Sequence, residues 1–391
     1  MNYAETRHDL HRHAQASGHE EYAHDLVVRH LRTLRPARLW EHVGSDATGN
    51  AYGVAAAWGN NPQDPTVVVR ADTDALPMHE TTALPYRSAH GGQAHKCGHD
   101  GHTAVLLALS DKVDEAFRLA PNPLAPLNVL LLWQPEEETG LGSQKMLDAN
   151  ILQGYNVAAC YAMHNLPGYA ENEVVLARGT FAAASAGLEI TLQGRQTHAS
   201  TPELGLNPGM AAARLMQRFA TLNNRHPFRQ STLIHVRLGE EAFGTSASHA
   251  TLAFTLRAFT NGEMRRLLAD AQDIVAQEAT REGLQCATRL REPFFATENH
   301  PQNVQHIAQA CAQLGRTVTY REEPFRWSED FANYLMRYPG ALFGVGSGAS
   351  HAELHHPDYD FPDAIIEPAA RLFYQILLGE SAKTSQPTTT Q

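Results

Sequence analysis

The chain is poor in cysteine and has no long apolar segment. Its 391 residues include four widely separated cysteines, which do not form the pattern of a secreted disulfide framework. No apolar run is long enough to cross a bilayer, and the first residues, MNYAETRHDLHRH, lack the apolar core of a signal peptide. These absences argue against a membrane protein and a disulfide-rich secreted protein. We expect a cytoplasmic protein with reduced thiols.

Basic residues are also scarce relative to acidic ones. Lys and Arg total 31 against 42 Asp and Glu, which gives a formal net charge of −11, and no basic patch or stripe of the kind that nucleic-acid binders carry is visible. Hydrophobic residues make up 43% and charged residues 19%, values that are typical of a globular chain with a buried core. We therefore expect neither nucleic acid nor a membrane as a partner.

Short apolar runs alternate with helical patterns over most of the chain. The first half contains strand-length runs at 51–58, 66–71, 128–133 and 157–163. Helical patterns precede and separate them; one is expected to begin near Ser17, with Glu20 as its capping-box partner. The alternation returns towards the C-terminus. It predicts an α/β domain whose sheet is covered on both faces.

The middle of the chain follows a different order. Strand and helix patterns occur there as strand 184–193, helix 207–222, strands 231–239 and 250–259, helix 264–283 and a last strand near residue 286. The order β-α-β-β-α-β is typical of a ferredoxin-like domain. We therefore predict a discontinuous α/β domain of residues 1–179 and 294–380, interrupted by an α+β domain at 180–293. The Thr-rich tail 381–391 is predicted to be disordered.

Polar side chains follow the predicted strands of the α/β domain. Asp72 and Asp74 come after 66–71, three glutamates at 136–138 follow 128–133, and His164 ends 157–163. Because the carboxyl ends of strands in such sheets form sites, we expect these groups to lie together. Uncompensated carboxylates there would call for a nearby cation, although a solvated acidic loop is the plainer reading of a glutamate run.

Two histidine-rich segments add further candidate ligands. HKCGHDGH (95–102) places Cys97 and His99 on either side of a glycine, and LHHPDYDF (354–361) brings His355 and His356 after a glycine-rich loop. Thiolate and imidazole together favour zinc-like ions over magnesium or calcium. Each motif alone has a simpler explanation as a hydrogen-bonding loop, and it is their combination that predicts a metal site.

The motifs VVVRADTDALP, HKCGHDGHTA, QPEEETGLG, MHNLPG, THAS, SEDF and LHHPDYDF occur in this order. Together they resemble the amidohydrolase branch of the M20 metallopeptidase family, which contains hippurate hydrolases, N-acyl-amino-acid amidohydrolases and auxin-conjugate hydrolases. The resemblance implies a phosphorylase/hydrolase-like α/β catalytic domain that holds two divalent metal ions. It also implies that the inserted ferredoxin-like domain is a lid that mediates dimerisation.

The resemblance also implies roles for single residues. Cys97 would bridge the two ions, with His99 and His164 on one ion and Glu138 and His355 on the other. Glu137 would be the general base, because the family pattern Gln-Pro-x-Glu-Glu leaves Glu136 in the variable position. Zinc, manganese, nickel and cobalt all suit this donor set.

Other residues are candidates around this centre. His198 in THAS is implied to reach the site of the partner subunit and to act in catalysis. Asp72 and Asp100 are expected to orient histidine ligands. Asp74, Glu80 and Glu329 could do the same, but buried ion pairs are an equal alternative for them.

Two segments depart from the family pattern. EEAFGTSASHATLAF is shorter than its counterpart and lacks the asparagine expected near a substrate carboxylate, for which His249, Ser246 or Ser248 are alternatives. Arg257, in the strand that follows, fits a family arginine and is a substrate candidate, with a salt bridge inside the lid as the alternative. Lys96 stands where the family often has alanine. It could lower the pKa of the Cys97 thiol or point to water.

The leading functional hypothesis is a metal-dependent amidohydrolase that cleaves N-acyl or N-aroyl amino acids to a carboxylate and a free amino acid. The alternative is a dipeptidase or aminopeptidase-like use of the same dinuclear site. A third hypothesis, a non-catalytic binding protein, fits poorly because the implied ligand set and base are complete. A homodimer or higher homo-oligomer is expected through the lid.

Overall fold

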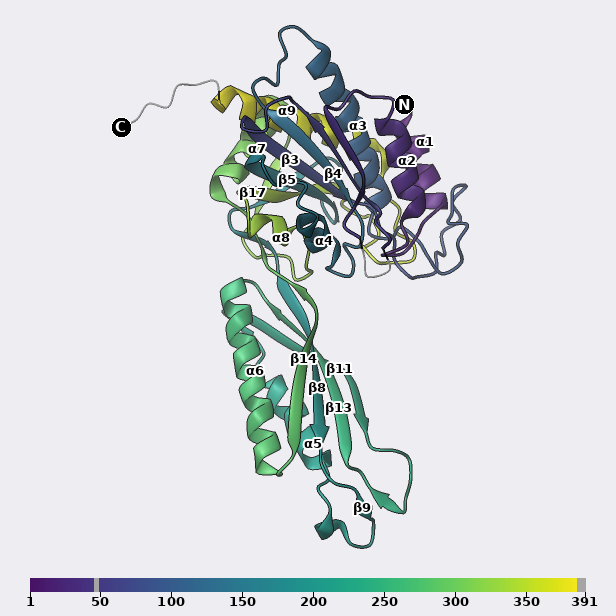
Figure 1. Ribbon diagram of the computed structural model, residues 1–391, viewed down its shortest axis with the longest axis vertical. Coiled ribbons are helices and arrows are strands. Elements are labelled where there is room, and N and C mark those ends of the chain that lie inside the picture. The colour runs from purple at the N-terminus through teal and green to yellow at the C-terminus, as the bar shows by residue number, and fades with distance from the viewer. Residues whose placement is uncertain (46–48, 385–391) are drawn as a thin grey trace, which may run out of the picture. The chain divides into compact units, whose positions relative to one another are not determined.

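The computed structural model describes residues 1–45 and 49–384, which form two compact units (Figure 1). The first unit comprises Met1–Phe181, Glu298–Glu323 and the chain from Asp330 onward; the second comprises Ala182–Thr297 and Pro324–Glu329. The short segment Pro324–Glu329 thus belongs to the second unit, which the sequence did not indicate. The reason is a backbone contact, because the Ala183 N–H donates to the carbonyls of Phe325 and Trp327, both at 2.9 Å.

An eight-stranded mixed sheet forms the centre of the first unit, in the order β1-β2-β4-β3-β5-β17-β6-β16. Strand β3 runs parallel to β4 and β5, and β17 runs parallel to β5, so the carboxyl ends of four neighbouring strands share one edge. The strands are β1 (Arg38–Val43), β2 (Gly53–Trp58), β3 (Pro65–Asp72), β4 (Asn128–Gln134), β5 (Asn156–Pro167), β6 (Val174–Ala177), β16 (Val318–Arg321) and β17 (Gly340–Gly348).

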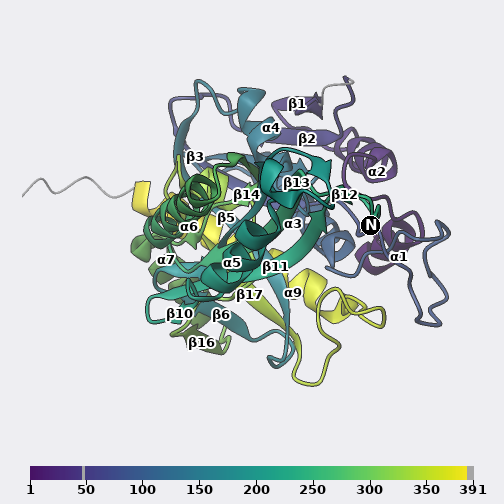
Figure 2. The same ribbon diagram turned by 90° about the horizontal axis from the view of Figure 1, so that it is seen from below.

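Both faces of this sheet are buried. Val67 and Val69 of β3 enter a core with helices α2, α3 and α9, and the intervening Val68 is equally buried. Burial of both faces explains the near-continuous apolar runs in the sequence. Figure 2 shows β1 and β2 beside α2. The helices are α1 (Tyr3–Arg12), α2 (Glu21–Leu31), α3 (His99–Arg118), α4 (Gly142–Asp148), α7 (Pro301–Gln313), α8 (Ala332–Leu335) and α9 (Ile366–Thr384), with a 3-10 turn at Asp363–Ile365.

Three details differ from the sequence prediction. Helix α2 begins at Glu21, and Ser17 does not cap it, because the Ser17 hydroxyl donates to Asp74 at 2.6 Å. Strands β1 and β6 were not predicted. Residues 381–384 of the predicted disordered tail are helical, since α9 continues to Thr384, and the remainder of that tail, 385–391, lies outside the described residues.

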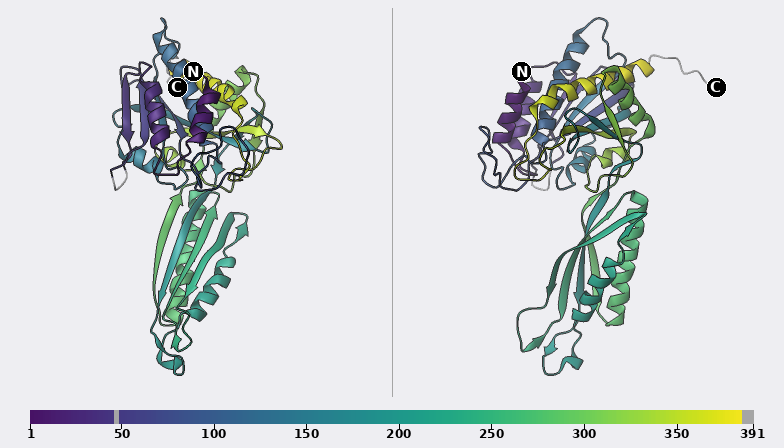
Figure 3. Two further views of the ribbon diagram at one scale, coloured as in Figure 1. Left: turned by 90° about the vertical axis from the view of Figure 1, so that its right-hand side faces the viewer. Right: turned by 180° about the vertical axis from the view of Figure 1, so that it is seen from behind.

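The second unit is a ferredoxin-like α+β fold, as predicted. Its sheet has the order β10-β11-β13-β8-β14, and α5 and α6 lie side by side on one face of it (Figure 3). Alternate residues of β8, among them Leu188 and Ile190, pack under these helices. The elements are β8 (Ala184–Gln193), β9 (Thr197–His198), a 3-10 turn (Pro202–Leu204), α5 (Gly209–Ala220), β10 (Asn224–Arg225), β11 (Phe228–Leu238), β12 (Thr245–Ser246), β13 (His249–Ala258), α6 (Asn261–Arg281) and β14 (Gln285–Phe294). The chain passes between the units within β7 (Thr180–Ala182) and β15 (Thr297–Glu298), and again on either side of Pro324–Glu329.

Candidate metal centre

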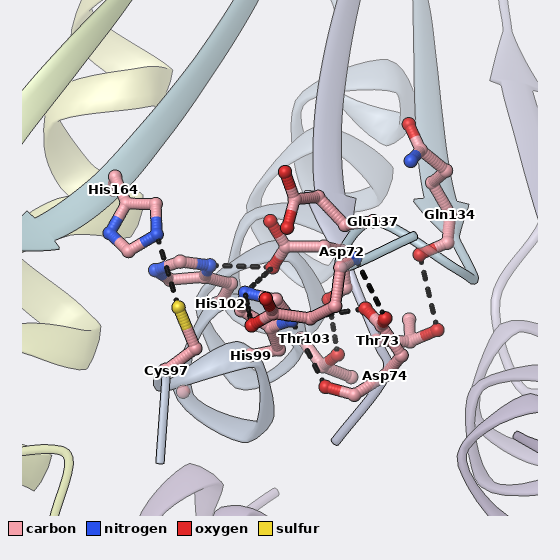
Figure 4. A network of polar contacts seen from close by, with 12 residues as sticks. Asp72, Thr73, Asp74, Cys97, His99, His102, Thr103, Gln134, Glu137 and His164 are labelled. Carbon is pink, nitrogen blue, oxygen red and sulfur yellow. Dashed lines mark hydrogen bonds and ion pairs between the residues drawn. The ribbon is translucent and has the colours of Figure 1, made fainter. Parts of the chain in front are cut away.

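The candidate ligands converge at the edge where β3, β4 and β5 end and α3 begins. Figure 4 shows three of them, Cys97, His99 and His164, together with Glu137. The turn that places them depends on Gly98, which has φ +95° and precedes the first residue of α3. A Cβ atom on Gly98 would lie 2.7 Å from the side-chain oxygen of Asn165, so only glycine fits both the conformation and the space. Cys97 and His99 are thereby turned towards one centre.

The five candidate ligands and Glu137 form overlapping groups at this centre. The Cys97 Sγ lies 3.5 Å from the His164 Nε2. Three sets of donor atoms each lie within 4.8 Å of one another, and they share members: Cys97 with His99 and His164, Cys97 with Glu138 and His355, and His99 with Glu137 and Glu138. Cys97 therefore stands between one pair of candidate ligands and the other, which is the arrangement a bridging thiolate needs.

Two buried atoms at the centre lack a hydrogen-bond partner. The His99 Nδ1 donates to the backbone carbonyl and the carboxylate of Asp74, at 3.0 and 3.1 Å, and its Nε2 is buried without a partner. The Glu138 Oε1 is likewise buried without a hydrogen-bond partner, 3.9 Å from that Nε2. Buried polar atoms are almost always hydrogen-bonded. A histidine acceptor and a carboxylate acceptor aimed at one space therefore fit a cation.

His355 completes the second pair. Its Nε2 lies 3.4 Å from the Glu138 Oε1, and the side chain is about half exposed. Its backbone adopts φ +62°, a left-handed conformation that is rare for residues other than glycine. The neighbouring His356 instead uses its Nδ1 to accept the N–H of Asp358 at 3.2 Å. The geometry therefore favours His355 over His356 as the candidate ligand.

The charges at the centre shift the pKa values of several groups. Burial, together with Glu138, Glu137 and Asp72, raises the pKa of the Cys97 thiol well above its usual range. Burial alone would lower the pKa of His99, but Asp72 and the other carboxylates outweigh it and raise that pKa to about 10. A surplus of carboxylate thus holds protons on neighbouring groups. A divalent cation would displace these protons, because metal ligands bind in their deprotonated forms.

Glu137 lies beside the ligands without belonging to either pair of the implied set. Its carboxylate is buried and accepts the N–H of Asp330 at 3.2 Å. Asp330 is held in turn, because its carboxylate accepts from the Ser143 N–H at 2.9 Å and pairs with Arg70 at 2.7 Å. A carboxylate fixed next to the ligand cluster can take up and release a proton.

The carboxylate that orients a candidate histidine ligand is not one of the two expected ones. Asp74, and not Asp72 or Asp100, makes the close hydrogen bond that orients the candidate ligand His99. Asp72 bonds His102 at 2.6 Å and Arg70 at 2.6 Å.

Asp100 is engaged away from the candidate ligands. Its carboxylate contacts His11 at 2.8 Å and Arg7 at 3.3 Å. Arg7 and His11 were not predicted as site residues. Their spacing of four residues in a helical segment was the available signal, because it puts both on one face of α1.

Lys96 fits neither of the two alternatives predicted for it, lowering the pKa of the Cys97 thiol or pointing to water. Its side chain is fully buried and its ammonium pairs with Glu80 at 2.7 Å, so it does not point to water. The expectation that Lys96 lowers the pKa of Cys97 is wrong, because that pKa is raised and the lysine makes no contact with the thiol among its hydrogen bonds.

Two predicted site residues lie in the second unit. His198 is exposed on β9, and its Nδ1 accepts the Ser200 N–H at 3.1 Å, which leaves Nε2 to carry the proton of the neutral ring. Arg257 is half-buried on β13 and donates to the carbonyl of Arg326 at 2.7 Å and the hydroxyl of Ser328 at 3.1 Å. No ion pair of Arg257 with a carboxylate occurs among the described residues, so the lid salt bridge is not formed there.

Comparison with known proteins places these features in a family. The peptidase family M20/M25/M40 matches residues 68–379. N-acetyl-L-cysteine deacetylase of Bacillus subtilis is 27% identical, covering 94% of this chain and 86% of its own. N-acetyldiaminopimelate deacetylase of Lactobacillus acidophilus is 26% identical, covering 89% and 90%. The crystal structure of the Bacillus subtilis YXEP protein, described as a dinuclear metal binding peptidase from the M20 family, shares the fold with a TM-score of 0.81, 23% identity and 97% coverage of both chains.

The fold and the cluster of donor atoms define a hydrolase with a candidate metal centre. The chain belongs to peptidase family M20/M25/M40, which confirms the resemblance drawn from the sequence. Within the described residues, no helix combines the length and apolar character needed to span a bilayer.

Proposed function

We propose that this protein is a dinuclear metal-dependent amidohydrolase that hydrolyses N-acyl or N-aroyl amino acids to a carboxylate and a free amino acid. The observation that carries the proposal is a pair of buried atoms without hydrogen-bond partners, His99 Nε2 and Glu138 Oε1, within a cluster that also holds Cys97. Two relatives with N-acetyl amino acids in their names support this substrate class.

The donor set suits two divalent ions such as zinc, manganese, nickel or cobalt. Cys97 would bridge them, His99 and His164 would hold one, and Glu138 and His355 the other. Zinc, manganese, nickel and cobalt accept this mixture of thiolate, imidazole and carboxylate. When bound, such ions polarise an amide carbonyl and lower the pKa of water towards neutrality. Asp74 fixes the His99 tautomer that presents Nε2 to an ion.

Glu137 is the general base in this proposal. It takes a proton from the attacking water and delivers it to the amine that leaves when the C–N bond breaks. The Asp330 N–H, 3.2 Å from its Oε1, keeps the carboxylate in place beside the candidate ligands. Glu136 is unsuited to this role, because its carboxylate pairs with Lys145.

His198 supplies the donor for the developing oxyanion. Its Nδ1 is engaged by Ser200, so its Nε2–H is free to donate to a substrate oxygen. Arg257 binds the carboxylate of the amino-acid part of the substrate. Burial lowers the pKa of Arg257 and none of the described carboxylates pairs with it, so an incoming carboxylate would complete its contacts.

We propose that the second unit also forms a homodimer. Strand β11 carries exposed apolar side chains, with Ile234 61% and Leu238 45% exposed. Among the described residues, the outer edge of β11 pairs only with the short β10, which covers residues 228 and 229. A long apolar edge strand is a ready template for pairing with another chain. A second copy of this chain would cover it, and His198 would then act in the site of the partner subunit.

The deciding experiment combines metal analysis with a substrate panel. Purified protein is expected to hold close to two equivalents of metal. N-acetyl, N-benzoyl and indole-acetyl amino acids are then assayed for released amine, beside matched dipeptides and after treatment with a chelator. Release from N-acyl amino acids that stops with the chelator and returns with metal supports the proposal. Turnover confined to dipeptides, or full activity without metal, contradicts it.

A further inference from the structure

Lys96 has an unusual position for a lysine. It stands directly before the candidate bridging residue Cys97, and its side chain is fully buried. Its ammonium donates to the Glu80 Oε1 at 2.7 Å, the Thr82 hydroxyl at 3.0 Å and the Tyr359 carbonyl at 2.7 Å. An ammonium has three N–H donors. All three are therefore committed to fixed partners, and none remains for a ligand or for water.

The bond from Lys96 to Glu80 supports the loop that carries Cys97 and His99. Glu80 also contacts His11 Nε2 at 3.1 Å, and His11 Nδ1 contacts Asp100 at 2.8 Å. A continuous buried path thus runs from Lys96 through Glu80 and His11 to Asp100. Its two ends lie immediately before Cys97 and immediately after His99. Such a closed polar path rigidifies what it encloses, because each buried group is satisfied only in one arrangement.

Two other bonds of Lys96 connect this loop to the segment that carries His355. The Lys96 carbonyl accepts the His355 N–H at 2.8 Å, while its ammonium holds the carbonyl of Tyr359. One residue therefore holds both ends of the segment 355–359. His355 needs such support, because its φ of +62° is an unfavourable conformation for a residue with a side chain.

We propose that Lys96 is a positioning residue for metal binding, which locks the Cys97–His99 loop against the His355 segment. This inference rests on the proposed function, since it gives Lys96 a role towards the ions of that site. Lys96 contacts no candidate ligand side chain in its hydrogen bonds; it acts through backbone atoms of His355 and Tyr359 and through the side chains of Glu80 and Thr82. Its loss is expected to weaken ion binding most at the pair Glu138 and His355.

The test compares Lys96→Met with Lys112→Met. Lys96→Met keeps the aliphatic stem and removes three hydrogen bonds. Lys112→Met is the matched control in the same unit, on α3, where the lysine forms only a partly exposed pair with Glu367 at 3.2 Å. Zinc affinity is measured by competition with a chromophoric chelator. We expect about 10–100-fold weaker binding of at least one ion in Lys96→Met, the loss typical when residues that orient metal ligands are removed. Lys112→Met should bind zinc with the affinity of the wild type.

A spectrum and a second variant separate positioning from general stability. Cobalt is loaded at saturating concentration, and the thiolate-to-cobalt charge-transfer band of wild type should shift or weaken in Lys96→Met. In the double variant Lys96→Met with Glu80→Gln, the carboxylate that has lost its ammonium partner is replaced by a neutral amide, so thermal stability should recover while zinc affinity stays low. Recovery of both together would overturn the inference, because Lys96 would then only balance a buried charge.

Two further results keep the inference distinct from the proposed function. If Lys96→Met does not fold, Thr82→Val removes one bond to the same ammonium at a partly exposed site, and a several-fold loss of zinc affinity is expected. Wild-type affinity and an unchanged band in whichever of these variants folds would reject the role of Lys96. Failure of the wild-type protein itself to bind ions would instead contradict the proposed dinuclear site.

Discussion

The two units hold their functional side chains in opposite ways. In the first unit, His99 is fully buried, oriented by Asp74, and surrounded by groups that are themselves fixed by hydrogen bonds. In the second unit, the His198 side chain is exposed, and among the described residues its ring forms hydrogen bonds with Ser200, two residues along the chain. Arg257 is held by a backbone carbonyl and a hydroxyl. The difference matches two tasks, because ion binding needs fixed donors in a dry site, whereas substrate contacts must be open to an incoming molecule.

This contrast predicts which substitutions affect metal and which affect only substrate. Changes in the first unit should alter the ions or the proton transfer beside them. Changes in the second unit should leave the ions in place. Each of the following variants tests one side of that division.

Glu137→Gln is expected to have the largest effect on turnover. The amide cannot accept a proton, so kcat should fall by about 10²–10⁴-fold. Metal content should stay near that of wild type, because Glu137 is outside the implied ligand pairs. Steady-state assays beside elemental analysis check both points. Glu136→Gln is the matched control one residue earlier in the same loop and should retain most of its activity; the reverse pattern would assign the base to Glu136.

His198→Ala is the corresponding change in the second unit. Loss of the oxyanion donor should lower kcat by about 10²–10³-fold with unchanged metal content. Mixing this variant with Glu137→Gln tests the proposed dimer, since a mixed dimer would contain one site with both functional residues. Recovery of activity after subunit exchange is the expected result. No recovery, in a mixture shown to exchange, would place His198 in the site of its own subunit.

The contrast also explains what could be predicted from the sequence. Strand-length apolar runs were enough to predict the α/β and ferredoxin-like folds, because the apolar residues of a strand themselves indicate that it is buried. The candidate ligands could be found because they follow strands or adjoin glycine. The support of His99 by Asp74 and the bonds of Lys96 could not, since they join residues that only the folded chain brings together.

Arg257→Gln should have a smaller effect, limited to substrates that carry a carboxylate. Removal of a charged hydrogen bond of roughly 1.5–3 kcal/mol corresponds to a fall of about 10–100-fold in kcat/KM. The matching N-acyl amine without a carboxylate serves as the control substrate and should be cleaved equally by both proteins. Equal losses on the two substrates would show that Arg257 acts through the structure of the second unit instead.

His11→Gln tests the stability of the first unit rather than turnover. Burial lowers the pKa of His11, but hydrogen bonds to Asp100 and Glu80 outweigh it and raise that pKa to about 9. Because the folded value lies above the unfolded value of about 6.5, the charged ring stabilises the fold fully below pH 6.5, and this contribution disappears as the pH rises through 9. With a chelator present, the difference in unfolding free energy between wild type and His11→Gln should therefore shrink by roughly 3 kcal/mol between pH 6 and 9.5. The raised pKa of His99 is common to both proteins and cancels in this difference. Urea titrations at several pH values measure it, and two curves that remain parallel would mean that His11 is neutral in the folded protein.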